Sequence, residues 1–199
     1  NKINSDYWYQ LEVNDPSTDA ADVLIQERDE LTGKIYLRVV EKTVAAKAPL
    51  TASLWKIEYS KEDGVSGGYF SFVNKETGYK LSFDQLLATS GNVEALSKGI
   101  SDWSWYINND NGTTALGWTP LYSVYTNAAG KKQVMYLDKA TATTENNAIN
   151  TALATNGYNC QTSASAPVAA TSLVAVKIGD VPANISTLNA LEIKPVIAA

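Results

Sequence analysis

The sequence contains no histidine and only one cysteine, Cys160. Without an imidazole, the chain has neither a Ser-His-Asp nor a Cys-His catalytic arrangement, and it has no zinc site that includes histidine. A single thiol excludes an intramolecular disulfide framework and a cysteine-cluster metal site. No sequence motif points to catalysis either. The sequence therefore favours a non-catalytic protein with no catalytic residues, no cofactor and no metal.

Positive charge is also scarce. The 199 residues carry 16 Lys and Arg against 21 Asp and Glu, and only Arg28 and Arg38 are arginines. Nucleic-acid binding needs clustered Lys and Arg, so this balance argues against a nucleic-acid partner. No run of 18 apolar residues occurs, so we expect no transmembrane segment. The low cysteine content and the many Thr and Asn residues are compatible with an exported bacterial protein. The expected location is extracytoplasmic, at the cell surface or secreted.

What the chain does contain is a series of short, strand-like runs with turn residues beside them. The expected strands span residues 7–13, 34–40, 53–59, 69–74, 79–83, 103–107, 121–126 and 133–138. Helix candidates are few and lie at residues 19–31, 84–96 and 145–154. The sequence therefore predicts an all-β fold.

Tryptophan and glycine recur at related spacings. The interval from Trp to Gly is 25, 23 and 25 residues in three pairs, Trp8 with Gly33, Trp55 with Gly78 and Trp105 with Gly130. Each unit has the pattern of a strand followed by a hairpin, with the glycine at a positive φ in the turn. A repeat of this kind predicts three pseudo-symmetric units that share one aromatic core. With 12 Gly and 5 Trp in the chain, chance alignment is the alternative.

The second unit carries the clearest version of the pattern. A Trp-x-Ile strand at Trp55–Ile57 precedes an aromatic strand at Phe70–Asn74, and Thr-Gly-x-Lys-Leu follows at Thr77–Leu81. This order resembles the repeat of the ricin-type β-trefoil lectins. It is also similar to the amino-terminal part of exported proteins of unknown function from gut Bacteroidales. The resemblance covers residues 7–138 at most and implies a β-trefoil-like barrel of three pseudo-repeats. A β-sandwich is the alternative.

The sugar-binding motif of those lectins is incomplete here. The family has Gln two residues before its Trp, whereas this chain has Asp6, Ser53 and Trp103. Ser82 follows Leu81 where the family places its sugar-binding Asp. The resemblance therefore implies the fold and does not extend to the galactose site.

The chain divides into two parts by composition. Residues 1–140 are expected to form the β-trefoil-like domain, and residues 141–199 form an extension rich in Ala, Thr and Asn. Two strand-like runs in this extension, 172–178 and 191–197, are too few for an independent domain. They either pack on the first domain or lead into a further domain.

Candidate ligand-binding residues lie in or near the polar connection at residues 108–114. They are Trp103, Asp110, Trp118 and Tyr122. An exposed aromatic face can stack on a sugar, and Asp or Asn can bind sugar hydroxyls, whereas core packing is the alternative for each aromatic residue. We expect a non-catalytic exported or cell-surface module for carbohydrate binding or adhesion, with glycans or another surface protein as partner. The alternative is a structural or protein-interaction module that has no sugar site.

Overall fold

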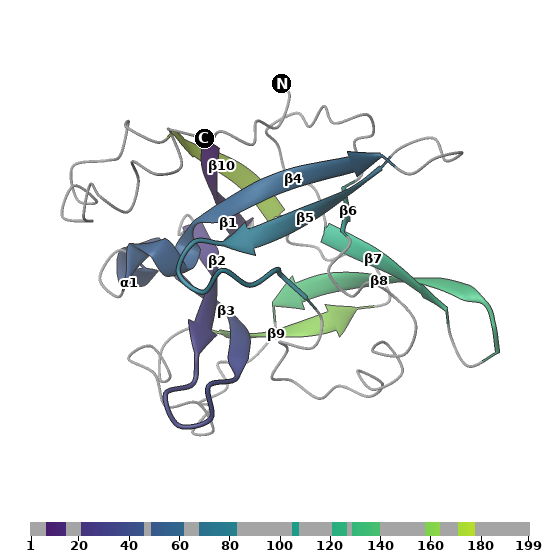
Figure 1. Ribbon diagram of the computed structural model, residues 1–199, viewed down its shortest axis with the longest axis horizontal. Coiled ribbons are helices and arrows are strands. Elements are labelled where there is room, and N and C mark those ends of the chain that lie inside the picture. Colours follow the sequence, from purple (N-terminus) through teal and green to yellow (C-terminus); the bar gives the residue numbers. More distant parts are fainter. Residues whose placement is uncertain are drawn as a thin grey trace.

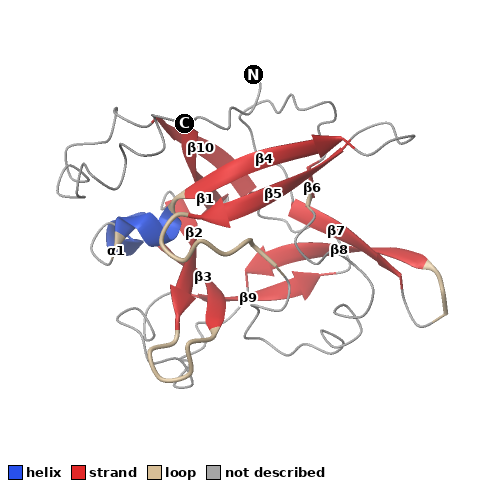
Figure 2. Cartoon of the chain, viewed as in Figure 1, coloured by secondary structure: helices blue, strands red, loops and turns tan. Residues whose placement is uncertain are grey.

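The described part of the computed structural model consists mostly of antiparallel β-strands (Figures 1 and 2). It describes residues 7–14, 21–45, 49–61, 68–82, 105–107, 121–126, 129–139, 158–163 and 171–177. Helical structure in these ranges is limited to one turn, α1 (Lys42–Ala45), and a short 3-10 segment, η1 (Leu50–Ser53). The predicted all-β class is therefore confirmed.

The N-terminal strands are arranged around β1 (Tyr7–Asn14). One edge of β1 pairs near its start with β4 (Trp55–Lys61) and near its end with β2 (Ala21–Arg28). Strand β2 continues into a hairpin with β3 (Ile35–Glu41), and β4 continues into a hairpin with β5 (Gly68–Asn74). These pairings agree with most of the strands expected from the sequence in this part of the chain.

The C-terminal strands form a second group, which lies below β4 and β5 in Figure 1. Strands β6 (Tyr106–Ile107), β7 (Leu121–Thr126), β8 (Lys132–Lys139) and β9 (Tyr158–Ser163) pair in chain order. Strand β9 then pairs with β3, which joins this group to the N-terminal strands. The sequence did not indicate β9.

The last described strand, β10 (Thr171–Lys177), corresponds to the strand expected at residues 172–178. It pairs with β1 from Tyr7 to Val13 in an antiparallel register. The second strand expected in the extension, 191–197, lies outside the described residues.

The described strands do not close into a barrel. The sheet path runs β5-β4-β1-β2-β3-β9-β8-β7-β6, with β10 beside β1. Its two ends meet at a single bridge, in which the N–H of Phe70 donates to the carbonyl of Trp105 at 2.7 Å and the reverse bond measures 2.8 Å. One bridge is not a ladder, so this pairing does not by itself establish the three pseudo-repeats of a trefoil.

Two hydrophobic clusters cover opposite faces of the β2–β3 hairpin, because side chains alternate along a strand. The larger cluster includes Leu24, Leu37 and Val39 and extends to the aromatic residues Tyr9, Trp55, Phe70, Phe72 and Trp105. The smaller cluster contains Val23, Ile25, Val40, Ala45 and Ala52, and so involves α1 and η1.

The repeated tryptophans all lie in the interior. The indole N–H of Trp55 donates to the carbonyl of Leu24 at 3.1 Å, and that of Trp105 donates to the carbonyl of Leu81 at 2.8 Å. Trp8 differs, because its buried indole N–H meets no acceptor among the described residues. The three glycines share a φ of 72°, 72° and 75°, so the predicted positive φ is confirmed at each turn.

The helix expected over residues 19–31 is wrong, because residues 21–28 form β2. Val23 and Ile25 face the smaller cluster while Leu24 faces the larger one, so the strand is buried on both sides. A strand buried on both faces has a continuous apolar run, and such a run cannot be distinguished from a helix by periodicity. The other two helix candidates, 84–96 and 145–154, lie outside the described residues.

Candidate functional site

Of the four predicted ligand-binding residues, only Tyr122 lies among the described residues. Trp103, Asp110 and Trp118 fall outside them. Tyr122 is half-buried on β7, and its ring packs at 50° against that of Tyr136 on β8, with the ring centroids 5.5 Å apart. Part of its surface is therefore covered by a neighbouring strand.

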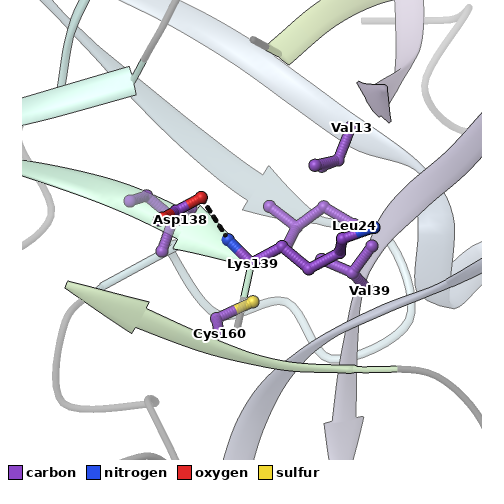
Figure 3. Close-up of a pocket in the computed structure, with 7 residues that line it drawn as sticks. Val13, Leu24, Val39, Asp138, Lys139 and Cys160 are labelled. Carbon is purple, nitrogen blue, oxygen red and sulfur yellow. Dashed lines mark hydrogen bonds between the residues drawn. The ribbon is translucent and has the colours of Figure 1, made fainter. Parts of the chain in front are cut away.

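A small cavity lies between the N-terminal strands and β8–β9 (Figure 3). Its volume is about 10 Å³, which is room for one water at most. The lining residues are Val13, Leu24, Val39, Leu137, Asp138, Lys139 and Cys160. A cavity of this size cannot hold a sugar or an organic cofactor.

The polar groups around this cavity are engaged with one another. Lys139 Nζ lies 3.2 Å from a carboxylate oxygen of Asp22 and 4.3 Å from the ring centroid of Tyr158. Burial raises the pKa of the Cys160 thiol to about 12, although Arg38 attracts the thiolate and lowers it in part. A thiol that stays protonated is a poor nucleophile and a poor metal ligand. The buried Cys160 side chain therefore contributes to packing.

No group of three His, Cys, Asp or Glu side chains within the described ranges is placed to hold a metal ion. None of the helices in those ranges has the length and apolar character needed to cross a bilayer.

Two hairpin turns on the surface share one hydrogen-bond pattern. In the first turn the N–H of Gly33 donates to the carbonyl of Asp29, four positions earlier, at 2.8 Å. In the second turn the N–H of Gly78 donates to the carbonyl of Asn74 at 2.9 Å. The N–H of Asp29 also donates to the carbonyl of Lys34 at 2.8 Å, and that of Asn74 donates to the carbonyl of Tyr79 at 3.0 Å. The side-chain oxygen of Asp29 or Asn74 also accepts from the N–H two residues later, as in an Asx turn. The first two of the three recurring glycines therefore lie in turns with the same hydrogen bonds.

The second turn is held to the rest of the molecule by side chains. Asn74 Nδ2 donates to the carbonyl of Ala52 at 2.8 Å, and the Thr77 hydroxyl donates to Gln26 Oε1. Gln26 Nε2 donates to the carbonyl of Lys80 at 3.3 Å. Bonds from both η1 and β2 thus fix the turn on either side of Gly78.

Tyr79 follows this fixed turn directly and is 50% exposed. The guanidinium carbon of Arg28 lies 5.6 Å from its ring centroid, and Arg28 Nη1 donates to the carbonyl of Gly33 at 3.3 Å. We refer to Arg28, Gly33 and Tyr79 as the Tyr79–Arg28 surface. This surface combines residues from both matched turns. It has an exposed aromatic ring with the Arg28 guanidinium over one of its faces.

Another exposed aromatic residue, Tyr59 on β4, has a different setting. It is 40% exposed, and its ring packs on that of Phe70 with the centroids 5.1 Å apart. No cation–aromatic contact involves it in the described part of the chain. Tyr59 therefore serves as a comparison for Tyr79.

The sequence places Tyr79 at the start of an expected strand, and it was not among the candidate binding residues. Within the described residues only Lys80 pairs there, through a bridge with Val73. The signal in the sequence was an aromatic residue immediately after a Thr-Gly turn, together with the rarity of arginine.

No protein-family model matches the chain, and no curated protein matches it.

Proposed function

We propose that this chain is a non-catalytic carbohydrate-binding module and that Tyr79 is the residue that stacks on a sugar ring. The observation that carries the proposal is the half-exposed ring on a turn that is fixed by Asn74, Thr77 and Gln26. An aromatic side chain offers a large apolar face, and a rigid support lowers the entropy lost on binding. An exposed face of this kind suits a long polysaccharide, which needs no deep pocket.

The wider proposal is an exported or cell-surface module with a β-trefoil-like arrangement of three units. The shared turns at Gly33 and Gly78 and the positive φ of Gly130 support it. The resemblance to ricin-type lectins favours carbohydrate binding, whereas the missing family Asp and Gln favour a site at a different position from the galactose site.

Affinity gel electrophoresis against a panel of soluble neutral and acidic polysaccharides tests the proposal. We expect at least one polysaccharide to retard the wild-type chain. Tyr79→Ala should lower the affinity for this polysaccharide roughly tenfold, since an aromatic contact contributes about 1 kcal/mol or more. Tyr59→Ala is the matched control, because it removes another exposed tyrosine, and it should bind as the wild type does. Absence of retardation across the panel, or equal losses in both variants, would count against the proposal.

A protein-interaction role is the second candidate, and Leu31 favours it. This side chain is 81% exposed at the tip of the first hairpin, where it offers apolar surface with no contact to the core. The two functions separate by experiment. A protein partner recovered from an envelope fraction should be lost with Leu31→Asp and kept with Tyr79→Ala, whereas glycan binding should show the reverse.

A further inference from the structure

We propose that the Tyr79–Arg28 surface selects sugars that carry a carboxylate, such as uronic acid units, and that Arg28 is the residue that determines this specificity. The inference rests on the proposed function, because it requires a sugar stacked on Tyr79. It goes further by naming the class of sugar and the group that recognises it.

Arg28 is an exposed cation, and two of the three carboxylates next to it in the chain, Asp29 and Glu27, are engaged elsewhere, while Glu30 is exposed to solvent. Asp29 accepts hydrogen bonds inside its own turn, from the N–H of Leu31 at 2.9 Å and from the Thr32 hydroxyl at 3.0 Å. Glu27 is buried, and its charge acts on Arg38. No ion pair joins Arg28 to a carboxylate within the described ranges. Its positive charge is therefore available to a ligand.

The guanidinium of Arg28 is also held in position. The carbonyl of Gly33 accepts from Nη1 at 3.3 Å, and the guanidinium carbon lies over one face of the Tyr79 ring, 5.6 Å from its centroid, which leaves the other face for a sugar. A guanidinium carries five N–H donors in a rigid fork, so most of them remain for a ligand. A carboxylate matches two of these donors in a bidentate pair, which an ammonium group cannot reproduce.

The surroundings suit one carboxylate at a time. The net charge of −5 opposes any polyanion as a whole, so a preference for acidic sugar has to come from a local charge pair. Arg28 is the one guanidinium on this surface, since Arg38 is buried. One oriented guanidinium beside one aromatic ring suits one carboxylate on the rim of a pyranose.

Binding of polygalacturonate and of its highly methyl-esterified form by the full chain, compared in a chelating buffer, tests the inference. The two polymers share a backbone, and the ester masks the carboxylate. We expect the wild type to bind polygalacturonate about two- to fivefold more tightly, because solvent weakens a charge pair at an exposed site. Arg28→Gln should remove the preference, and Arg28→Lys should restore only part of it.

Lys34→Gln is the matched control, since it removes one exposed positive charge from the same hairpin. It should keep the preference. Equal binding of the two polymers, a preference that survives Arg28→Gln, or an equal loss in Lys34→Gln would overturn the inference. If a neutral glycan binds in a Tyr79-dependent manner without a preference for acid, the inference fails while the proposed function stands. If no polysaccharide binds, both fail.

Discussion

The Cys160 thiol lies in the interior beside Arg38 and Asp138, and its burial disfavours the charged form. This raises its pKa from 9.0 to about 12 in the folded chain. Its environment explains why a lone cysteine in this chain acts as a small core residue. The sequence also has no histidine that could activate a thiol.

The raised pKa predicts a pH dependence of stability. Between about pH 9 and 12 the unfolded thiol loses its proton while the folded thiol keeps it, so the unfolded state binds fewer protons and stability falls as pH rises. Below pH 9 the thiol keeps its proton in both the folded and the unfolded state, so this loss of stability is absent. In urea unfolding at pH 8 and pH 10.5, the wild type should lose more free energy of unfolding than Cys160→Ala does over the same interval. Equal losses would contradict the buried, protonated thiol.

At the scale of elements, the turn at Gly78 makes a direct prediction. Its φ is 72°, and no atom lies within 4 Å of the position that a Cβ would take, so the cost of Gly78→Ala is conformational alone. We expect a loss of about 1 kcal/mol in the free energy of unfolding, because side chains other than glycine are disfavoured in the left-handed region. Gly78→Asn is the control and should lose less, since Asn tolerates that region. An unchanged stability in Gly78→Ala would rule out this turn geometry.

The elements also show what a sequence can and cannot predict. Strand β7 was predicted to the residue, β5 to within one residue and β4 two residues too early, because these strands combine aromatic or β-branched residues with flanking turns. Strand β2 was mistaken for a helix, since both of its faces are buried. Strand β9 was missed, because Tyr158–Ser163 is largely polar and its pairing with β3 and β8 is set by distant parts of the chain.

At the scale of the whole molecule, the ion pair between Lys139 and Asp22 links β8 to β2 across 117 positions of sequence. Both side chains are mostly buried, so Lys139→Met leaves a carboxylate without its partner. We expect a loss of about 1 to 3 kcal/mol in the free energy of unfolding, below the value for a fully buried pair. Lys56→Met breaks an exposed pair with Glu58 at 3.6 Å and should cost about 0.5 kcal/mol or less. Similar losses in the two variants would contradict a stabilising role for the ion pair between Lys139 and Asp22.

The candidate site forms only when the whole chain has folded, because its residues are far apart in the sequence. Arg28 and Tyr79 belong to different hairpins, and neither is conspicuous in its own segment. The sequence favoured the aromatic residues near residues 108–114, of which Tyr122 packs against Tyr136. The periodic pattern of a chain predicts turns, but the packing of one turn against another depends on long-range contacts such as that between Gln26 and Lys80.

The central claim is that the Tyr79 ring binds sugar, and the most direct test is the NMR spectrum of the chain with ¹³C-labelled tyrosine rings. The Tyr79 signals are identified by their absence in Tyr79→Phe. On titration with oligosaccharides of the polysaccharide that retards the chain in affinity electrophoresis, we predict that the Tyr79 ring signals shift progressively and saturate, while those of Tyr59 stay in place. A titration that leaves the Tyr79 signals unmoved at saturating oligosaccharide would contradict the account.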